Sequence, residues 1–258
     1  VHTLPGKEGV YDFARLIDSQ NNGLLILGDS HAGHLSYGFA QAYPKLNINV
    51  GRFGIPLLKT DVTSMRVFPK EFDYLSSDYL GKQSTVLLSA WWPLYGSTYP
   101  SASYGRQEWP INYEGKSYPI KDLAWAEPAL RQTFDYLLTQ GKSVIFTHDI
   151  PVLKYKPTDC FIQRPFKLTG KSISCDQNKA DIVAEHQAFR SIAERVLKDY
   201  PSIKVFDPLT FMCDEHICHA TKNGKSLYLD DNHLSMFGSE EYGKAFKAAF
   251  PDLFKPEQ

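Results

Sequence analysis

The chain has 258 residues, of which 43% are hydrophobic and 22% are charged. This composition is typical of a packed globular protein and excludes wholesale disorder. With 28 basic and 29 acidic residues the formal net charge is -1, so we do not expect a nucleic-acid partner held by general electrostatics. The uninterrupted apolar runs, such as residues 23–27, are too short to cross a bilayer.

Several segments have the patterning of regular secondary structure. Short apolar runs bounded by glycine or polar residues predict buried strands, and apolar residues three and four positions apart predict helices. In chain order we expect strand 24–27, helix 32–42, strands 46–50 and 85–89, helix 123–140, strand 143–147, helix 180–200, strand 202–206 and helix 235–250. This alternation predicts an α/β domain in which helices cover both faces of a mainly parallel sheet.

The chain shows no internal repeat and no linker after about residue 22. We therefore expect one domain over residues 23–258. The first residues carry neither an initiating Met nor an apolar leader. Residues 1–22 are accordingly interpreted as an N-terminal extension or linker from an upstream membrane region.

Three long segments without a regular pattern follow predicted strands, at residues 91–119, 151–178 and 207–226. Loops of this length in a compact domain are usually functional or else decorations of the fold. Because loops after parallel strands meet at the carboxyl edge of the sheet, we expect the functional site at that edge.

The four cysteines fall into two local pairs, Cys160 with Cys175 and Cys213 with Cys218. An even number in polar, loop-like segments favours two disulfides formed in an oxidising compartment. Four cysteines allow three connectivities, and four reduced thiols are the alternative.

Two groups of residues have some of the character of metal or haem sites. Cys213, His216, Cys218 and His219 are closely spaced, and residues 31–34 form an H-x-x-H pair. Structural zinc requires a second ligand pair, which does not follow downstream, and haem attachment uses a shorter cysteine spacing. A small disulfide-closed loop and no metal are therefore the favoured interpretation.

Ser30 occupies the position after the first predicted strand and before a helix, within Gly28-Asp29-Ser30. A serine at that turn projects its hydroxyl from the sheet edge, and its backbone N–H can face a developing oxyanion. The simpler alternative is that Asp29 or Ser30 only caps the helix, since both residue types are favoured there.

Asp230 and His233 stand three residues apart in a short polar segment before the last predicted helix. A hydroxyl nucleophile needs a base, and the base needs an acceptor that fixes its tautomer. The simpler alternative is a solvated turn followed by Ser235 as a helix cap.

Taken together, the sequences G-D-S-H-A-G-H-L at 28–35 and Y-L-D-D-N-H-L-S at 228–235 resemble the first and last sequence blocks of the SGNH (GDSL-like) hydrolase superfamily. They are similar above all to the periplasmic SGNH domains fused to bacterial membrane O-acyltransferases of the O-antigen acetyltransferase type. The resemblance implies a three-layer α/β/α sandwich with a five-stranded parallel, flavodoxin-like sheet. It also implies Ser30 as nucleophile, Asp230 as triad acid and His233 as base.

Members of this superfamily typically add a glycine and an asparagine to the oxyanion hole. Gly54 is the candidate for the glycine, with Gly51 as its rival. No Gly-x-Asn follows strand 85–89, where the chain has Trp91 and Trp92. The hole is then one donor short, or an indole N–H takes the place of the asparagine. These two rings are also candidates to stack on sugar faces, as are Tyr95, Tyr99, Tyr104, Trp109 and Tyr113.

The resemblance implies a serine-dependent enzyme without a cofactor. In the favoured interpretation an attached or partner integral-membrane acyltransferase module delivers an acyl group, and the serine passes it to a sugar hydroxyl of a cell-envelope glycan such as lipopolysaccharide O-antigen. The expected location is the periplasmic side of a bacterial inner-membrane protein. The alternatives are a stand-alone carbohydrate acetylesterase with the same three residues and a non-catalytic glycan-binding domain.

Overall fold

The fold is taken from a computed structural model of the whole chain. The structure describes residues 23–52, 54–62, 83–96, 100–101, 105–106, 110–119, 121–161 and 174–254. The expected N-terminal extension at residues 1–22 lies outside the described residues. Within them, no helix combines the length and apolar character needed to cross a membrane.

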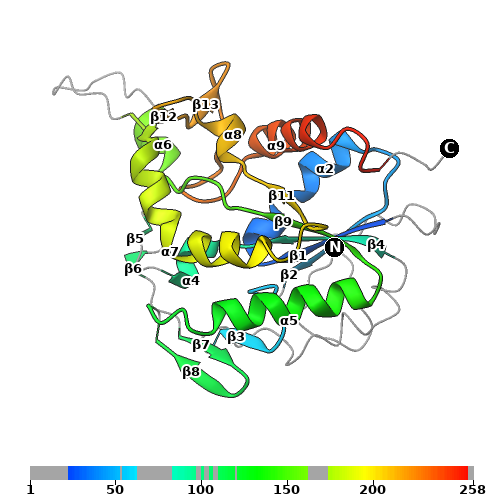
Figure 1. Cartoon of the computed structure of the whole chain (residues 1–258). Helices are drawn as coiled ribbons and strands as arrows, with labels where there is room; N and C mark the ends of the chain where they lie inside the picture. The colour runs from blue at the N-terminus through cyan, green and yellow to red at the C-terminus, as the bar shows by residue number, and fades with distance from the viewer. Residues whose placement is uncertain are drawn as a thin grey trace, which may run out of the picture.

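Five parallel strands form the central sheet in the spatial order β11-β9-β4-β1-β2 (Figure 1). They are β1 (Gly23–Gly28), β2 (Ile48–Arg52), β4 (Gln83–Ser89), β9 (Ser143–Thr147) and β11 (Lys204–Phe206). The predicted five-stranded parallel sheet is thus confirmed, with β2 two residues later than expected. Because β1 lies between β2 and β4, the chain reverses its direction of winding there. The carboxyl ends of β1 and β4 therefore flank the place where such sheets bind ligands.

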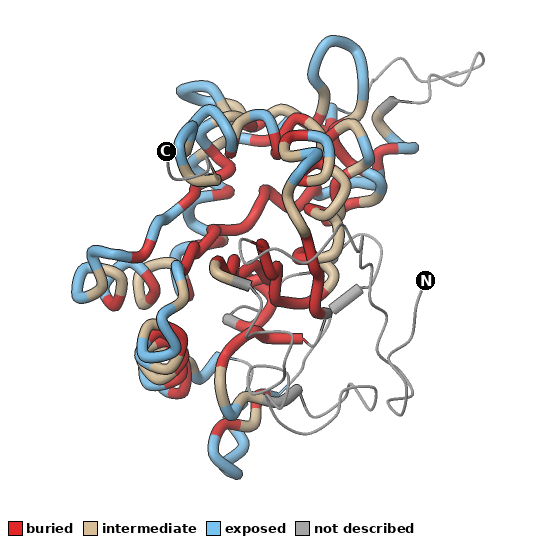
Figure 2. Tube along the Cα trace, turned by 90° about the vertical axis from the view of Figure 1, so that its right-hand side faces the viewer, coloured by how far each residue is buried: buried red, intermediate tan, exposed pale blue. Residues whose placement is uncertain are grey.

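Two helices cover each face of the sheet (Figure 1). They are α2 (Ser36–Ala42) with α9 (Met236–Ala249), and α5 (Ala126–Thr139) with α7 (Lys179–Leu197). Leu24 and Ile26 of β1 pack toward the first pair, whereas Leu25 and Leu27 pack toward the second. Burial on both faces explains why the strands are nearly continuous apolar runs. Figure 2 shows this buried interior along the central strands.

The predicted helix 32–42 is wrong in one respect, because it is divided into α1 (Ser30–Gly33) and α2. The Ser36 hydroxyl donates to the Gly33 carbonyl at 2.8 Å. A side chain that occupies a backbone acceptor in this way competes with the helical hydrogen bond. The break leaves α1 as a separate turn at the end of β1.

Glycines allow α2 and α9 to touch through their backbones. A Cβ at Gly38 would overlap the carbonyl of Ser239, and a Cβ at Gly243 would overlap the carbonyl of Gly38. The Gly38 N–H also donates to the Ser239 hydroxyl at 2.8 Å. Ser235 caps α9 by accepting from the Gly238 N–H at 3.0 Å. This cap was predicted in the simpler interpretation of the segment around Asp230 and His233. These contacts fix the helix that follows Asp230 and His233.

Short elements fill the three long segments for which no regular structure was predicted. The helices among them are α4 (Trp92–Gly96), α6 (Pro157–Phe161) and α8 (Leu209–Met212). The strands are β3 (Thr60–Val62), which precedes these segments, and β5 (Pro100–Ser101), β6 (Gly105–Arg106), β7 (Ile111–Tyr113), β8 (Lys116–Tyr118), β10 (Gln177–Asn178), β12 (Ile217–Cys218), β13 (Thr221–Lys222) and β14 (Lys225–Ser226).

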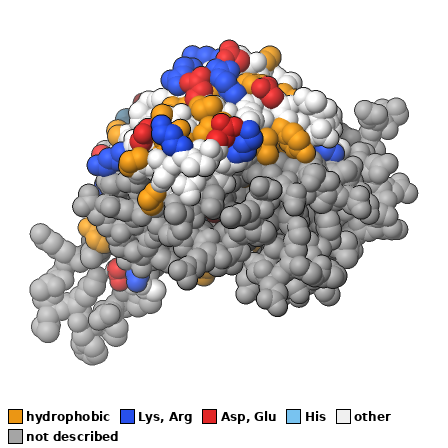
Figure 3. Space-filling view, turned by 90° about the horizontal axis from the view of Figure 1, so that it is seen from below, with side chains coloured by type: hydrophobic (Ala, Val, Ile, Leu, Met, Phe, Trp, Pro, Cys, Tyr) orange, Lys and Arg blue, Asp and Glu red, His pale blue; other side chains and the backbone are white. Residues whose placement is uncertain are grey.

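Both predicted disulfides are present, Cys160–Cys175 and Cys213–Cys218. Seen from below, the described surface intersperses basic and acidic side chains (Figure 3). Glu127 of α5 shows the same mixing, since it pairs with Arg131 of the same helix and with Arg195 near the end of α7.

Candidate active site

Ser30 begins α1 directly after the end of β1. Asp29 precedes it as the N-cap, and its Oδ1 accepts the His31 N–H at 2.7 Å. The other carboxylate oxygen of Asp29 accepts the Trp91 N–H at 2.9 Å and the Tyr95 hydroxyl at 2.8 Å. Asp29 therefore caps α1 and also ties it to Trp91 and Tyr95. The half-buried Ser30 hydroxyl has no hydrogen-bond partner in the part of the chain that the structure describes, so it is available for chemistry.

Close backbone contact sets the position of this turn. At Gly28 a Cβ would overlap the carbonyl oxygen of Ser89 at the end of β4. A larger residue would force β1 and β4 apart at the point where Ser30 leaves the sheet.

Asp230 and His233 lie in a tight hairpin between β14 and α9. Its ends are joined by the bridge between Tyr228 and Leu234, and the Leu229 N–H donates to the His233 carbonyl at 2.8 Å. Inside the hairpin, Nδ1 of His233 is 2.8 Å from Oδ2 of Asp230. The predicted pairing of these two side chains is thus present in the structure.

The hydrogen bonds around Asp230 keep its carboxyl group ionised. Partial burial raises the pKa of Asp230, but hydrogen bonds from the His233 ring and from the backbone N–H groups of Asn232 and His233 outweigh it and lower the pKa to about 2. Asp230 is therefore ionised at neutral pH, and Nδ1 of His233 donates to it. Nε2 is left as the basic nitrogen of the ring.

This hairpin contacts α1, the short helix that begins at Ser30, and the residue that follows it. The ring of His233 lies 5.3 Å from the ring of His31 and 6.0 Å from that of His34, measured between centroids. The Leu234 N–H also donates to Nδ1 of His34 at 3.4 Å. Residues about 200 positions apart thus meet at the carboxyl edge of the sheet, where α1 carries Ser30 and His31 and is followed by His34.

The oxyanion candidates occupy different environments. Gly51 lies within β2, paired with Leu27, whereas Gly54 lies beyond the end of β2 with a φ of 95°. Trp91 is 5% exposed and stacks on His31 at 5.3 Å. Its indole N–H is buried and has no partner among the described residues.

Trp92 does not fit the role of an oxyanion donor or sugar platform. Its indole N–H donates to the Thr147 carbonyl at 2.8 Å, and its ring stacks on Phe146 and Phe189 inside the core. Tyr95 and Tyr113 are buried as well. That these rings pack into the hydrophobic core was not predicted from the sequence. The other aromatic candidates, Tyr99, Tyr104 and Trp109, lie outside the described residues.

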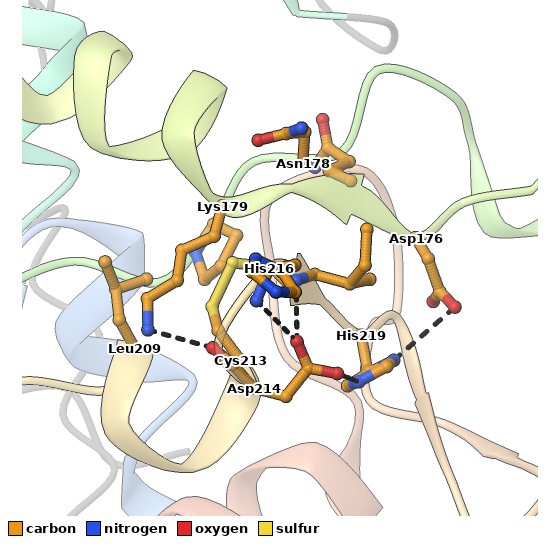
Figure 4. Close-up of a disulfide and its surroundings, with 12 residues drawn as sticks. Asp176, Asn178, Lys179, Leu209, Cys213, Asp214, His216 and His219 are labelled. Carbon is orange, nitrogen blue, oxygen red and sulfur yellow. Dashed lines mark hydrogen bonds and ion pairs between the residues drawn. A yellow bond between two sulfur atoms is a disulfide. The ribbon is translucent and has the colours of Figure 1, made fainter.

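The Cys213, His216, Cys218 and His219 group forms a disulfide-closed loop (Figure 4). Asp214 organises it, because its carboxylate accepts the backbone N–H groups of His216 and Ile217 and contacts the His219 ring at 3.0 Å. On the other side of that ring, Asp176 is 3.5 Å away. Among the described residues, no set of three or more His, Cys, Asp or Glu side chains is placed to hold a metal ion.

Sequence reasoning missed one residue next to the site. Asp149 follows β9 and contacts Nδ1 of His31 at 2.7 Å, with both side chains buried. The signal available in the sequence was a carboxylate just past a buried strand, at the same edge as Ser30.

A family model described as "SGNH domain (fused to AT3 domains)" matches residues 4–248. No curated protein matches the chain. Among solved structures, the acetyl xylan esterase AlAXEase has a TM-score of 0.47 at 13% identity, covering 88% of this chain and 99% of the esterase. A GDSL-like lipase from Bacteroides thetaiotaomicron has a TM-score of 0.44 at 9% identity, covering 92% of each chain.

Proposed function

Since the chain belongs to the family of SGNH domains fused to AT3 domains, we propose that it is a serine-dependent O-acyltransferase domain. It moves an acetyl group through Ser30 to a sugar hydroxyl of a cell-envelope glycan such as lipopolysaccharide O-antigen. The observation that carries this proposal is the packing of the Asp230–His233 hairpin against α1. It places the His233 ring, paired with Asp230, beside His31 in the turn that begins with Ser30.

Acylation begins when Nε2 of His233 accepts the proton of the Ser30 hydroxyl and Oγ attacks the acyl carbon of the donor. The bond from that carbon to the donor's oxygen or sulfur breaks, and His233 returns the proton to this leaving group. Throughout, ionised Asp230 stabilises the imidazolium through Nδ1. The products are acetyl-Ser30 and the free alcohol or thiol of the donor.

Transfer repeats the same chemistry with a different nucleophile. Nε2 of His233 accepts the proton of the sugar hydroxyl while the sugar oxygen attacks the acyl-serine. The bond from the acyl carbon to Oγ breaks, and His233 returns its proton to Ser30. Water at the acceptor position gives hydrolysis instead, so the acceptor that reaches this position decides between transferase and esterase.

The oxyanion of each step needs donors, and we assign the backbone N–H groups of Ser30 and Gly54 to this role. Gly54 is preferred over Gly51 because it lies past the end of β2, whereas Gly51 is paired inside the ladder. The indole N–H of Trp91, which has no partner among the described residues, is the candidate third donor. A missing donor costs about 3 kcal/mol of transition-state stabilisation, so slow turnover is expected without it.

The acyl group must come from elsewhere, and the AT3 part of the family architecture is the proposed source. The two disulfides support an oxidising compartment. A periplasmic domain of an inner-membrane protein satisfies both conditions, with the glycan as acceptor on the same side.

The decisive experiment compares wild type with Ser30→Ala in the full-length protein. Loss of acetyl groups from the purified surface polysaccharide, followed by NMR or mass spectrometry, supports transfer. More acetylation in the variant, together with efficient deacetylation of a glycan by the wild-type domain, supports a carbohydrate acetylesterase. Unchanged acetylation with retained glycan binding supports a non-catalytic domain.

A further inference from the structure

The segment that follows β9, residues 149–153, contacts both parts of the candidate site. At its start, Oδ1 of Asp149 lies 2.7 Å from Nδ1 of His31 in α1. At its end, the Leu153 N–H donates to the Asp231 carbonyl, in the hairpin between β14 and α9, at 2.6 Å. The 149–153 segment therefore connects the helix that presents the nucleophile with the hairpin that carries the base.

Two side chains from elsewhere in the chain hold this segment. All five of its residues are buried without regular secondary structure, so its backbone polar groups need partners outside it. The Tyr228 hydroxyl donates to the Pro151 carbonyl at 2.8 Å. Nε2 of Gln177 donates to the next carbonyl, that of Val152, at 2.6 Å. Successive carbonyls of the segment are thus fixed by two different elements.

Tyr228 belongs to the hairpin itself. It stands at the base of the hairpin, where it is bridged to Leu234, the residue after His233. Its side chain is 3% exposed. The bond from its hydroxyl holds the base of the hairpin on the 149–153 segment, and the bond from Leu153 to Asp231 holds the turn of the hairpin on it. The hairpin is therefore attached to this segment at two points.

Gln177 reaches the segment from a cross-linked backbone. It lies in β10, where it pairs with Cys218 of β12. Cys218 is bound to Cys213, and Cys175, two positions before Gln177, is bound to Cys160. Both disulfides therefore end beside the residue that fixes the Val152 carbonyl. A buried side chain on so constrained a backbone defines the position of the group to which it donates.

We propose that Gln177 and Tyr228 are positioning residues of the triad: by holding the 149–153 segment, they keep the hairpin of His233 aligned with Ser30 in α1. This inference rests on the proposed function, because it concerns the same acyl-transfer site. Neither side chain takes part in the acyl-transfer steps above. Both act through the segment that bonds α1 at one end and the hairpin at the other.

The test uses the 258-residue chain with an aryl acetate substrate. Tyr228→Phe and Gln177→Met each remove one donor at nearly constant size and leave a buried carbonyl without its partner. We expect kcat to fall by about tenfold to a hundredfold in each variant, as it does for small misplacements of catalytic groups. KM should change little. Because each donor has its own variant, a failure of one variant to fold leaves the other as the test.

Tyr242→Phe is the matched control. Tyr242 is a tyrosine of α9 that is 1% exposed, and its hydroxyl lies 2.6 Å from the hydroxyl of Thr147. The same substitution there removes a buried hydrogen bond that does not involve the 149–153 segment, so kcat and KM should stay at their wild-type values. Urea unfolding verifies that each variant is folded under the assay conditions. An equal loss of kcat in Tyr242→Phe would overturn the positioning role.

NMR of the His233 ring gives a readout that needs no activity. The rings of His233 and His31 are 5.3 Å apart, so a displaced hairpin changes the ring-current shifts of the His233 ring protons. These signals should move in Tyr228→Phe and in Gln177→Met and should keep their positions in Tyr242→Phe. Unchanged His233 signals in the first two variants would overturn the proposal, whatever happens to kcat.

Ser30→Ala separates this inference from the proposed function. If Ser30→Ala retains aryl acetate hydrolysis, the proposed function itself fails. If Ser30→Ala is inactive while Tyr228→Phe and Gln177→Met keep the wild-type kcat, only the positioning role is overturned. Loss of kcat together with displaced His233 signals in both variants, and neither effect in Tyr242→Phe, supports the proposal.

Discussion

Asp29 accepts the backbone N–H of Trp91 at 2.9 Å and thereby ties the turn after β1 to the segment after β4. The same oxygen accepts the Tyr95 hydroxyl, and the other oxygen accepts the His31 N–H. All three partners are donors. A single buried carboxylate thus sets the position of Ser30 relative to the loop that carries the indole of Trp91.

Asp29→Asn should destabilise the protein more than Tyr95→Phe does. In either orientation of the asparagine amide, its NH₂ group faces a backbone or hydroxyl donor, which costs about 1–3 kcal/mol for a buried unsatisfied group. Tyr95→Phe removes one donor and leaves Asp29 two, at a cost of about 0.5–1.5 kcal/mol. Urea unfolding measures both. Equal losses in the two variants would show that the carboxylate does not organise this turn.

Ser30→Ala and His233→Ala should each abolish hydrolysis of an aryl acetate, and the double variant should lose no more than either single one. Members of a triad act as a unit, so their effects are not additive. Asp230→Asn should lower kcat by as much as about 10⁴, because the wrong tautomer of His233 is then favoured. A fluorophosphonate should label Ser30, as mass spectrometry of the modified peptide would show. Label on another serine would contradict the assignment.

Asp230 should make stability depend on pH in the acid range. Its pKa of about 2 in the folded protein lies below the ordinary value of about 3.9 in an unfolded chain. Its contribution to the free energy of unfolding is therefore complete above about pH 4 and is lost as pH falls toward about 2. Asp230→Asn should flatten the loss of stability in that window, as followed by denaturant unfolding at each pH.

Asp214→Asn is the comparison for this measurement. The pKa of Asp214 is also lowered to about 2, first by the backbone N–H groups of Ile217 and His216. Asp214→Asn should therefore also flatten the loss of stability in the same pH window, without changing aryl acetate hydrolysis. A pH profile of stability that Asp230→Asn leaves unaltered would mean that the pair with His233 is not formed in solution.

The sheet and the Asp230–His233 pair could be predicted because their signals are local. Buried strands such as β1 and β4 are short apolar runs, and Asp230 and His233 pair within one turn. The division of helix 32–42 depends on the Ser36 hydroxyl taking the Gly33 carbonyl. The spacing of apolar residues does not reveal that competition, so the break in the helix could not be predicted from it.

Long-range pairs were harder to predict. Asp149 contacts His31 across 118 positions, and no local sequence pattern indicates that the two residues pair. Trp92 was a candidate for substrate contact, yet it fills the core between Phe146 and Phe189. An aromatic side chain just past a strand packs inward or outward according to the helices that cover it, and those are set by distant sequence.

Removing the disulfides should lower stability by different amounts. The Cys160–Cys175 bridge spans 15 positions and Cys213–Cys218 spans 5. From loop-closure entropy, the paired Cys→Ser variants should lose about 3 and about 2 kcal/mol respectively. Urea unfolding under oxidising conditions measures this, and non-reducing peptide mapping verifies the pairing. Equal unfolding curves with and without reductant would contradict the expected stabilisation by the disulfides.

Gly28→Ala should reduce both stability and activity, because the added Cβ meets the Ser89 carbonyl where β1 delivers Ser30. Overpacking of this kind costs about 1–3 kcal/mol, and the shift at the strand end should lower kcat.

Gly115→Ala, in the β7–β8 turn, is the control. Gly115 has a φ of 80° with open space around it. Its substitution should cost about 1–2 kcal/mol through backbone conformation alone and leave kcat/KM unchanged. Aryl acetate kinetics and urea unfolding on both variants separate the two effects. If Gly28→Ala loses stability but keeps wild-type kcat, the contact with Ser89 does not position the nucleophile.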